Sequence, residues 1–389
     1  MKLTPILTVA SLVSLVAAHA GPAPLTWKRD NLEARDTLER RCGNALAHKR
    51  AKRAEEAMGS VMAKRELAGA DLSALPKRST NKDSTCLVTP EVTQGPYHVL
   101  GEIVRQNMTE DQAGVPLEIN VDFIDINTCE PLANYWIDMW QCNSTGQYAH
   151  YASLTLGGGG GGGAGNPPPG SGSGSQAFPS STEASTTTSL GTYSGADDPA
   201  VGQFLNTTME GNETFLRAVY PTDENGHLKA YTLVPGWYSG RAVHFHIKVF
   251  PEGYIAENGT FVANSSAQHT GQFFFDANTM DAVRQVAPYT QNTIAWEDAV
   301  ANEDDQWYPY QSATGYDAEM SITWVGDKVE DGLVGSITVA VNTSYTSPEL
   351  STQYSSFNVS EYLAKGYLPF ASTDALEAGA TAAAFARAS

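Results

Sequence analysis

Hydrophobic and polar residues alternate along much of this chain, which is the period expected of β-strands. The clearest example is LEINVDFIDI at residues 117–126, and a second alternating segment, YWIDMWQ, follows at 135–141. Because a turn with Pro131 and Asn134 separates the two, we expect them to form an antiparallel hairpin. Further strands are expected at 214–219, 228–234, 242–250, 272–275, 321–325 and 334–341. The pattern predicts an all-β domain over residues 86–345.

Two regions differ from this pattern. Residues 157–199 consist mainly of glycine, proline, serine and threonine. These residues bury too little apolar surface to offset the entropy of ordering, so we expect a disordered surface loop inside the domain. Residues 346–389 form a tail with an Ala-rich end.

The leader, residues 21–85, is helix-prone and basic. Residues 1–85 hold fifteen Lys and Arg against nine Asp and Glu, whereas residues 86–389 hold nine against 34. The leader's basic residues occur in pairs, such as Lys64-Arg65 and Lys77-Arg78. Such pairs are typical of a pro-segment removed by a dibasic-specific protease, and we favour a mobile or processed leader. The alternative is a charged helical arm that packs on the domain or pairs two subunits.

The first residues predict secretion. Residues 1–20 combine Lys2, an apolar run and a small-residue site, Ala18-His19-Ala20, as signal peptides do. No stretch has the roughly 20 apolar residues that a membrane span needs. Eight Asn-x-Ser/Thr sites add to the expectation of a secreted glycoprotein: Asn107, Asn143, Asn206, Asn212, Asn258, Asn264, Asn342 and Asn358. A net charge of −19 argues against nucleic-acid partners.

Four cysteines in an oxidising compartment indicate disulfides, and they allow three pairings. We favour Cys129–Cys142 because the two residues would close the predicted hairpin. Cys86 would then pair with Cys42 or remain a free thiol.

The strongest candidate for chemistry is PGWYSGRAVHFH at residues 235–246. Its proline and glycines predict a tight turn that leads into a strand. In that strand His244 and His246 point to one face, about 7 Å apart along the chain, so both imidazoles can reach a single metal ion. Tyr238 and Arg241 precede them closely. The competing interpretation is a chance pair of histidines on a surface strand.

This segment resembles the ferric-iron signature of the intradiol ring-cleavage (catechol-type) dioxygenases, in which a Tyr after a Pro-Gly turn, an Arg and a His-x-His complete the metal site. The resemblance extends to CLVTPEVTQGPYHV at 86–99 and to NSTGQY at 143–148. It implies a non-haem Fe(III) bound by Tyr148, Tyr238, His244 and His246, with Arg241 and Gln272 as catalytic helpers. Tyr151 and Tyr193 are weaker alternatives for the first ligand, and Tyr97 is either a pocket residue or a buried structural one.

The resemblance also implies a fold and a reaction. The fold is an intradiol-dioxygenase-like β-sandwich, and the reaction is O2-dependent cleavage of a catechol between its two hydroxyl-bearing carbons to a muconate-type diacid. Hard phenolate donors favour Fe(III), and the strand segment HFHIKVF has no carboxylate for a 2-His-1-carboxylate Fe(II) site. The acidic chain favours neutral over carboxylated catechols. The resemblance does not extend to the leader and predicts no oligomeric state.

Two other functions fit the same pattern. One is a non-catalytic secreted β-sandwich that binds a surface or a carbohydrate. The other is a different His-x-His metalloenzyme that binds zinc or copper.

Overall fold

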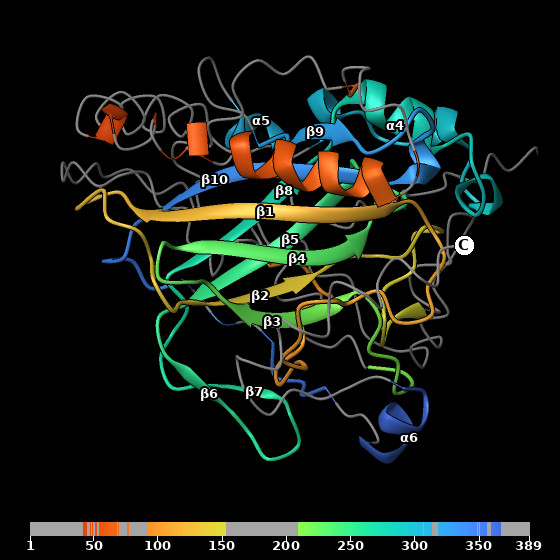
Figure 1. Cartoon of the computed structure of the whole chain (residues 1–389). Coiled ribbons are helices and arrows are strands. Elements are labelled where there is room, and N and C mark those ends of the chain that lie inside the picture. The colour runs from red at the N-terminus through yellow and green to blue at the C-terminus, as the bar shows by residue number, and fades with distance from the viewer. Residues whose placement is uncertain are drawn as a thin grey trace, which may run out of the picture.

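The strands of the computed structural model form two four-stranded sheets and a small hairpin (Figure 1). The structure describes residue 92, residues 94–152, and residues 209–366 except 306, 313–317, 348, 350 and 356–358, together with parts of 42–77. The first sheet has the order β4-β1-β10-β9 and the second β3-β2-β5-β8. The first contains β1 (Pro116–Asp125), β4 (His227–Leu233), β9 (Ser321–Trp324) and β10 (Leu333–Val341).

The second sheet contains β2 (Trp136–Trp140), β3 (Arg217–Pro221), β5 (His244–Phe250) and β8 (His269–Phe274), and the hairpin pairs β6 (Gly253–Ile255) with β7 (Phe261–Ala263). The labelled helices are short: α4 (Ala277–Val283), α5 (Tyr308–Gln311) and α6 (Val359–Ala364). Single 3-10 turns lie at Tyr289–Gln291, Trp296–Asp298, Asn302–Asp304 and Val329–Asp331. The prediction of an all-β domain is confirmed. Among the residues described, no helix has the length and apolar character needed to cross a bilayer.

The two large sheets pack face to face on one hydrophobic core. Every second residue of a strand points inward, so β1 contributes Ile119 and Val121, and β5 contributes Phe245 and Ile247. The opposite face of β5 carries the polar residues of the strand, including His246. The face expected to bind a metal is therefore the outer face of the second sheet.

The predicted hairpin of 117–126 and 135–141 is wrong. Strand β1 pairs with β10 in parallel and with β4 in antiparallel fashion, whereas β2 pairs with β3 and β5 in the other sheet. The chain therefore crosses from one sheet to the other between them. Alternation identified both strands, because it reports which face of a strand is buried. It does not report which strand lies alongside.

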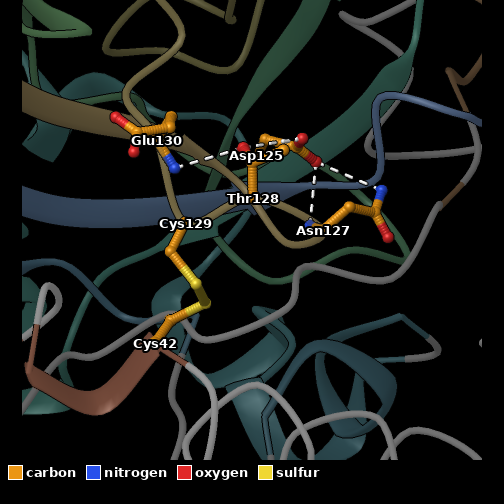
Figure 2. Close-up of a disulfide and its surroundings, with 6 residues drawn as sticks. All are labelled: Cys42, Asp125, Asn127, Thr128, Cys129 and Glu130. Carbon is orange, nitrogen blue, oxygen red and sulfur yellow. Dashed lines mark hydrogen bonds between the residues drawn. A yellow bond between two sulfur atoms is a disulfide. The ribbon is translucent and has the colours of Figure 1, made fainter.

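The preferred disulfide is also wrong. Cys129 is bonded to Cys42 (Figure 2), with Cα atoms 5.4 Å apart. Cys142 is a buried free thiol. Cys129 precedes β2 and Cys142 follows it, so a five-residue strand of about 17 Å separates them. A disulfide requires Cα atoms within about 7 Å. Cys86 lies outside the described residues.

The turn that presents Cys129 is built on Asp125 at the end of β1. Its carboxylate accepts hydrogen bonds from the backbone N–H of Asn127 at 3.0 Å and from the hydroxyl of Thr128 at 3.0 Å (Figure 2). Cys129 itself has a φ of 64° and donates its N–H to the Asp125 carbonyl. The disulfide therefore ties the leader to a turn that is fixed by local hydrogen bonds.

Most of the described part of the leader is helical, and it packs on the first sheet. A helix over residues 54–67 lies beside β1 and β10 (Figure 1), and its Val61 packs against Val325 and Val334. Lys64 Nζ lies 2.8 Å from the buried Glu118 carboxylate. This packing is what the charged-arm interpretation predicts. Proteolytic removal of the leader stays a prediction.

The packed domain continues into the predicted tail. Gln353 and Ser355 exchange backbone hydrogen bonds with Leu100, and Ser347 donates its N–H to the Ala267 carbonyl. The predicted signal peptide, the insertion at 157–199 and the Ala-rich end of the tail lie outside the described residues.

Candidate metal centre

Two turns that carry tyrosines lie against each other beside the second sheet. Gly146 has a φ of +84°, and a Cβ at this position would come closer than 3.0 Å to the carbonyl oxygen of Trp237. A Cβ on Gly236 would come equally close to a backbone oxygen of the opposite turn. Only glycine permits both approaches. Each glycine stands two residues before a tyrosine, so the close contact brings Tyr148 and Tyr238 together.

The two histidines of β5 direct their Nε2 atoms toward each other at 2.9 Å. His244 Nδ1 lies 2.6 Å from the Ala242 carbonyl oxygen, which can only accept, so Nδ1 carries the proton. The Nε2 of the neutral His244 ring then presents a lone pair, and the Tyr238 hydroxyl lies 3.3 Å from it. Burial and the nearby Arg241 guanidinium lower the pKa of His244 to about 3. The ring is therefore neutral, as a metal ligand must be.

Tyr148 completes the cluster of four predicted ligands. Its ring centroid lies 5.7 Å from that of Tyr238 and 6.4 Å from that of His246. Burial raises the pKa of Tyr148 well above its usual value, and the adjacent Tyr238 adds to the rise. The structure thus brings all four predicted ligands together, each at most 7% exposed.

The predicted helpers lie next to this cluster. Gln272 in β8 is paired with His246 in β5, and its Oε1 accepts a hydrogen bond from Arg241 Nη2 at 2.5 Å. Arg241 is fully buried and interacts electrostatically with Tyr238 and His244. A buried cation at this position is part of the site rather than a solvated charge at a strand edge.

Sequence reasoning missed Asp305, which pairs with Arg241. Arg241 Nε donates to Asp305 Oδ2 at 2.7 Å, and both side chains are fully buried. Burial by itself would raise the pKa of Asp305, but the Arg241 guanidinium and its hydrogen bonds outweigh this and lower it. Asp305 stands 64 residues after Arg241, between the 3-10 turn at Asn302–Asp304 and the short helix α5. No local signal in the sequence marks it.

Trp140 of β2 supports one ligand from the side. Its ring stacks on His246 with centroids 4.7 Å apart and an interplanar angle of 9°. The His98 ring also contacts Trp140, and its Nε2 lies 2.9 Å from the Asp138 carboxylate. Burial favours the neutral form of His98, but the carboxylates of Glu349 and Asp138 outweigh it and raise its pKa. Trp140 therefore separates His246 from a network of charged groups formed by His98, Asp138 and Glu349.

The alternative tyrosines do not join the cluster in the same way. Tyr151 contacts the Tyr97 ring at 5.2 Å, and its hydroxyl accepts a hydrogen bond from Gln353. Tyr193 lies outside the described residues. Tyr97 stacks on Tyr148 with ring centroids 4.6 Å apart, a contact that fits both interpretations of this residue.

The donor set suits a hard, highly charged cation. Among the described residues, no group of three or more His, Cys, Asp or Glu is placed to hold a metal ion. Asp305 interacts with His244, but its oxygens already accept hydrogen bonds from Arg241 and from backbone N–H groups. The donors at this site are therefore two phenol oxygens and two imidazole nitrogens. Ionised phenols are hard anionic ligands, so the set fits Fe(III) better than a thiolate-seeking metal.

Comparison with known proteins gives weak structural likenesses only. No family model and no curated protein matches the chain. An intradiol ring-cleavage dioxygenase from Tetranychus urticae is 24% identical, with a TM-score of 0.46, over 68% of this chain and 98% of that chain. Catechol 1,2-dioxygenases from Acinetobacter sp. ADP1 and Pseudomonas arvilla C-1 are each 15% identical, with TM-scores of 0.34 and 0.32. The Acinetobacter match covers 65% of this chain and 62% of that chain, and the Pseudomonas match covers 81% of this chain and 75% of that chain.

Proposed function

We propose that this protein is a non-haem Fe(III) dioxygenase that cleaves catechol-type diols between their hydroxyl-bearing carbons with O2, giving muconate-type diacids. The observation that carries the proposal is the buried convergence of two phenols and two imidazoles, with His244 Nε2 2.9 Å from His246 Nε2 and 3.3 Å from the Tyr238 hydroxyl. The buried Arg241 adjoins this cluster.

The four ligands would be Tyr148, Tyr238, His244 and His246. When bound, the ferric ion supplies a Lewis acid and a redox centre that make a catecholate ring reactive toward O2. The protein orients its imidazoles in advance, because the Ala242 carbonyl fixes the His244 ring and Trp140 stacks on His246. Such supporting contacts set the tautomer and direction of a ligating ring.

The two tyrosines have different surroundings. Tyr238 is 7% exposed, whereas Tyr148 is completely buried. We assign to the Tyr238 oxygen the role of accepting a proton from a substrate hydroxyl, because Tyr238 is the less deeply buried of the two tyrosines. Tyr148 remains a ligand throughout.

Arg241 and Gln272 act on the substrate rather than on the metal. The guanidinium has no lone pair to give to a cation, but it would stabilise negative charge that develops on the ring of the substrate. Such a charge interaction is strong in a site that excludes water. Gln272 holds the guanidinium through its Oε1.

A secreted location and a neutral substrate are part of the proposal. Secretion rests on the signal-peptide features at residues 1–20 and on the eight glycosylation sequons. The net charge of −19 disfavours long-range attraction of carboxylated catechols.

Turnover tests the proposal. The purified protein, supplied with iron, should consume O2 in the presence of catechol and form a muconate-type diacid in equal amount. Zinc- or copper-dependent activity would support the other metalloenzyme interpretation. Failure of the iron-loaded protein to turn over any catechol, carboxylated ones included, would contradict the proposal and leave the binding-module interpretation.

A further inference from the structure

We propose that Asp305 is a positioning residue, whose single carboxylate holds Arg241 and the backbone that orients His244 in one arrangement. This inference rests on the proposed function for its catalytic consequence. The contacts that support it are independent of any bound metal.

The two oxygens of Asp305 have separate sets of partners. Oδ2 accepts hydrogen bonds from Arg241 Nε at 2.7 Å and from the Ala242 N–H at 2.9 Å. Oδ1 lies 3.3 Å from Arg241 Nη2 and accepts from the backbone N–H groups of Trp307 at 2.8 Å and Tyr308 at 3.1 Å. The carboxylate therefore joins the turn before β5 to the start of α5.

This connection continues to a candidate ligand. Ala242 gives its N–H to Asp305 and receives the Nδ1–H of His244 on its carbonyl oxygen at 2.6 Å. A shift of Ala242 would therefore rotate the His244 ring. One carboxylate thus fixes the guanidinium directly and the imidazole through one residue of backbone.

The same segment holds the second helper. Gln311 of α5 accepts the backbone N–H of Gln272 at 3.0 Å, and Gln272 Oε1 accepts from Arg241 Nη2. Two residues of this segment therefore hold the two helpers. Asp305 binds Arg241, and Gln311 binds Gln272.

Charge gives a second reason for an acid at this position. Arg241 is completely buried, and an isolated buried cation is costly. It would also repel a metal cation bound at the nearby histidines. Asp305 makes the pair neutral, so the guanidinium can stand beside a cation site and still interact with an anionic substrate.

Asp305→Asn tests the inference with little change of shape. The amide oxygen can serve only one of the two sets of partners, and the amide NH2 would face N–H donors on the other side. We expect turnover to fall by about 10- to 100-fold, the range seen when residues that orient a metal site are changed. Iron content at saturating supply should be retained. Unchanged turnover in an otherwise active enzyme would overturn the inference.

A double variant separates positioning from a general structural effect. If part of the effect of Asp305 passes through Arg241, then adding Asp305→Asn to Arg241→Gln should slow turnover by a smaller factor than Asp305→Asn does in the native protein. Multiplying losses would overturn the inference. If Asp305→Asn alone does not fold, the double variant should fold, because it leaves no uncompensated buried charge. Failure of the double variant to fold would show that Asp305 serves only the fold of 305–311.

A measurement on the metal-free protein needs no activity. The Arg241 Nε–H should be protected from solvent exchange in the NMR spectrum of the native protein and should lose that protection in Asp305→Asn. Asp281→Asn is the matched control, because Asp281 pairs with Arg284 Nε at 2.9 Å on the surface. Equal protection in native and Asp305→Asn proteins would overturn the inference. An inactive native protein that shows the expected exchange pattern would contradict the proposed function alone.

Discussion

Replacing Arg241 by glutamine should abolish most turnover without removing the metal. Arg241 is fully buried beside the candidate ligands, and its guanidinium offers no lone pair to a cation. A preorganised donor that stabilises transition-state charge is typically worth about 2.7–4 kcal/mol, which corresponds to about 100- to 1000-fold in rate. The change also leaves the buried Asp305 carboxyl group without its partner, at a cost of about 3–5 kcal/mol in unfolding free energy.

The assay measures bound iron, the visible spectrum and catechol turnover on the same preparations. Arg241→Gln should retain iron and the tyrosinate-to-Fe(III) absorption band while turnover falls. His246→Ala is the contrasting variant, because it removes one of four protein donors and should lose iron and colour together. Arg284→Gln, a surface change, should leave all three unchanged. Full activity in Arg241→Gln, or loss of its iron, would refute the assigned role.

Three further variants test the supporting structure. Gly146→Ala should destabilise the protein by about 1–3 kcal/mol and lower its iron content, because the position has a φ of +84° and no room for a Cβ. The control Gly59→Ala should change neither stability nor iron content, because a Cβ there meets nothing within 4 Å. Because its pKa is raised, His98 contributes stability that is complete below about pH 6.5 and is lost as pH rises through the folded pKa, so urea titrations of His98→Gln should show a flatter pH dependence. The double change Cys42→Ser and Cys129→Ser removes a disulfide between residues that are 87 positions apart, and it should lower the free energy of unfolding by about 4–5 kcal/mol in the chain-entropy model. An unchanged urea midpoint would contradict this prediction.

The sequence predicted those features that depend on neighbouring residues. Strand periodicity gave β1, β2, β5 and β10 to within two residues at each end, because one face of each is buried in the shared core. The spacing of His244 and His246 determines their common face in any extended strand. The glycines two residues before Tyr148 and Tyr238 indicated tight turns.

The features that failed depend on contacts between distant segments. Alternation could not show that β1 and β2 belong to different sheets, and the wrong hairpin led directly to the wrong partner for Cys129. Asp305 could not be predicted, because the local sequence around a carboxylate between a 3-10 turn and a short helix is the same whether the carboxylate is solvated or buried. Only its position against Arg241 distinguishes the two cases.

The most direct test of the central claim is the metal content and colour of the purified protein from an iron-sufficient host. The four-ligand site predicts one iron per chain and a visible tyrosinate-to-Fe(III) band that fades on reduction of the iron. In the Tyr148→Phe variant, which keeps the ring and removes one donor oxygen, the band should shift or disappear. A colourless native preparation that binds no iron, or an unchanged spectrum in Tyr148→Phe, would contradict the proposed centre.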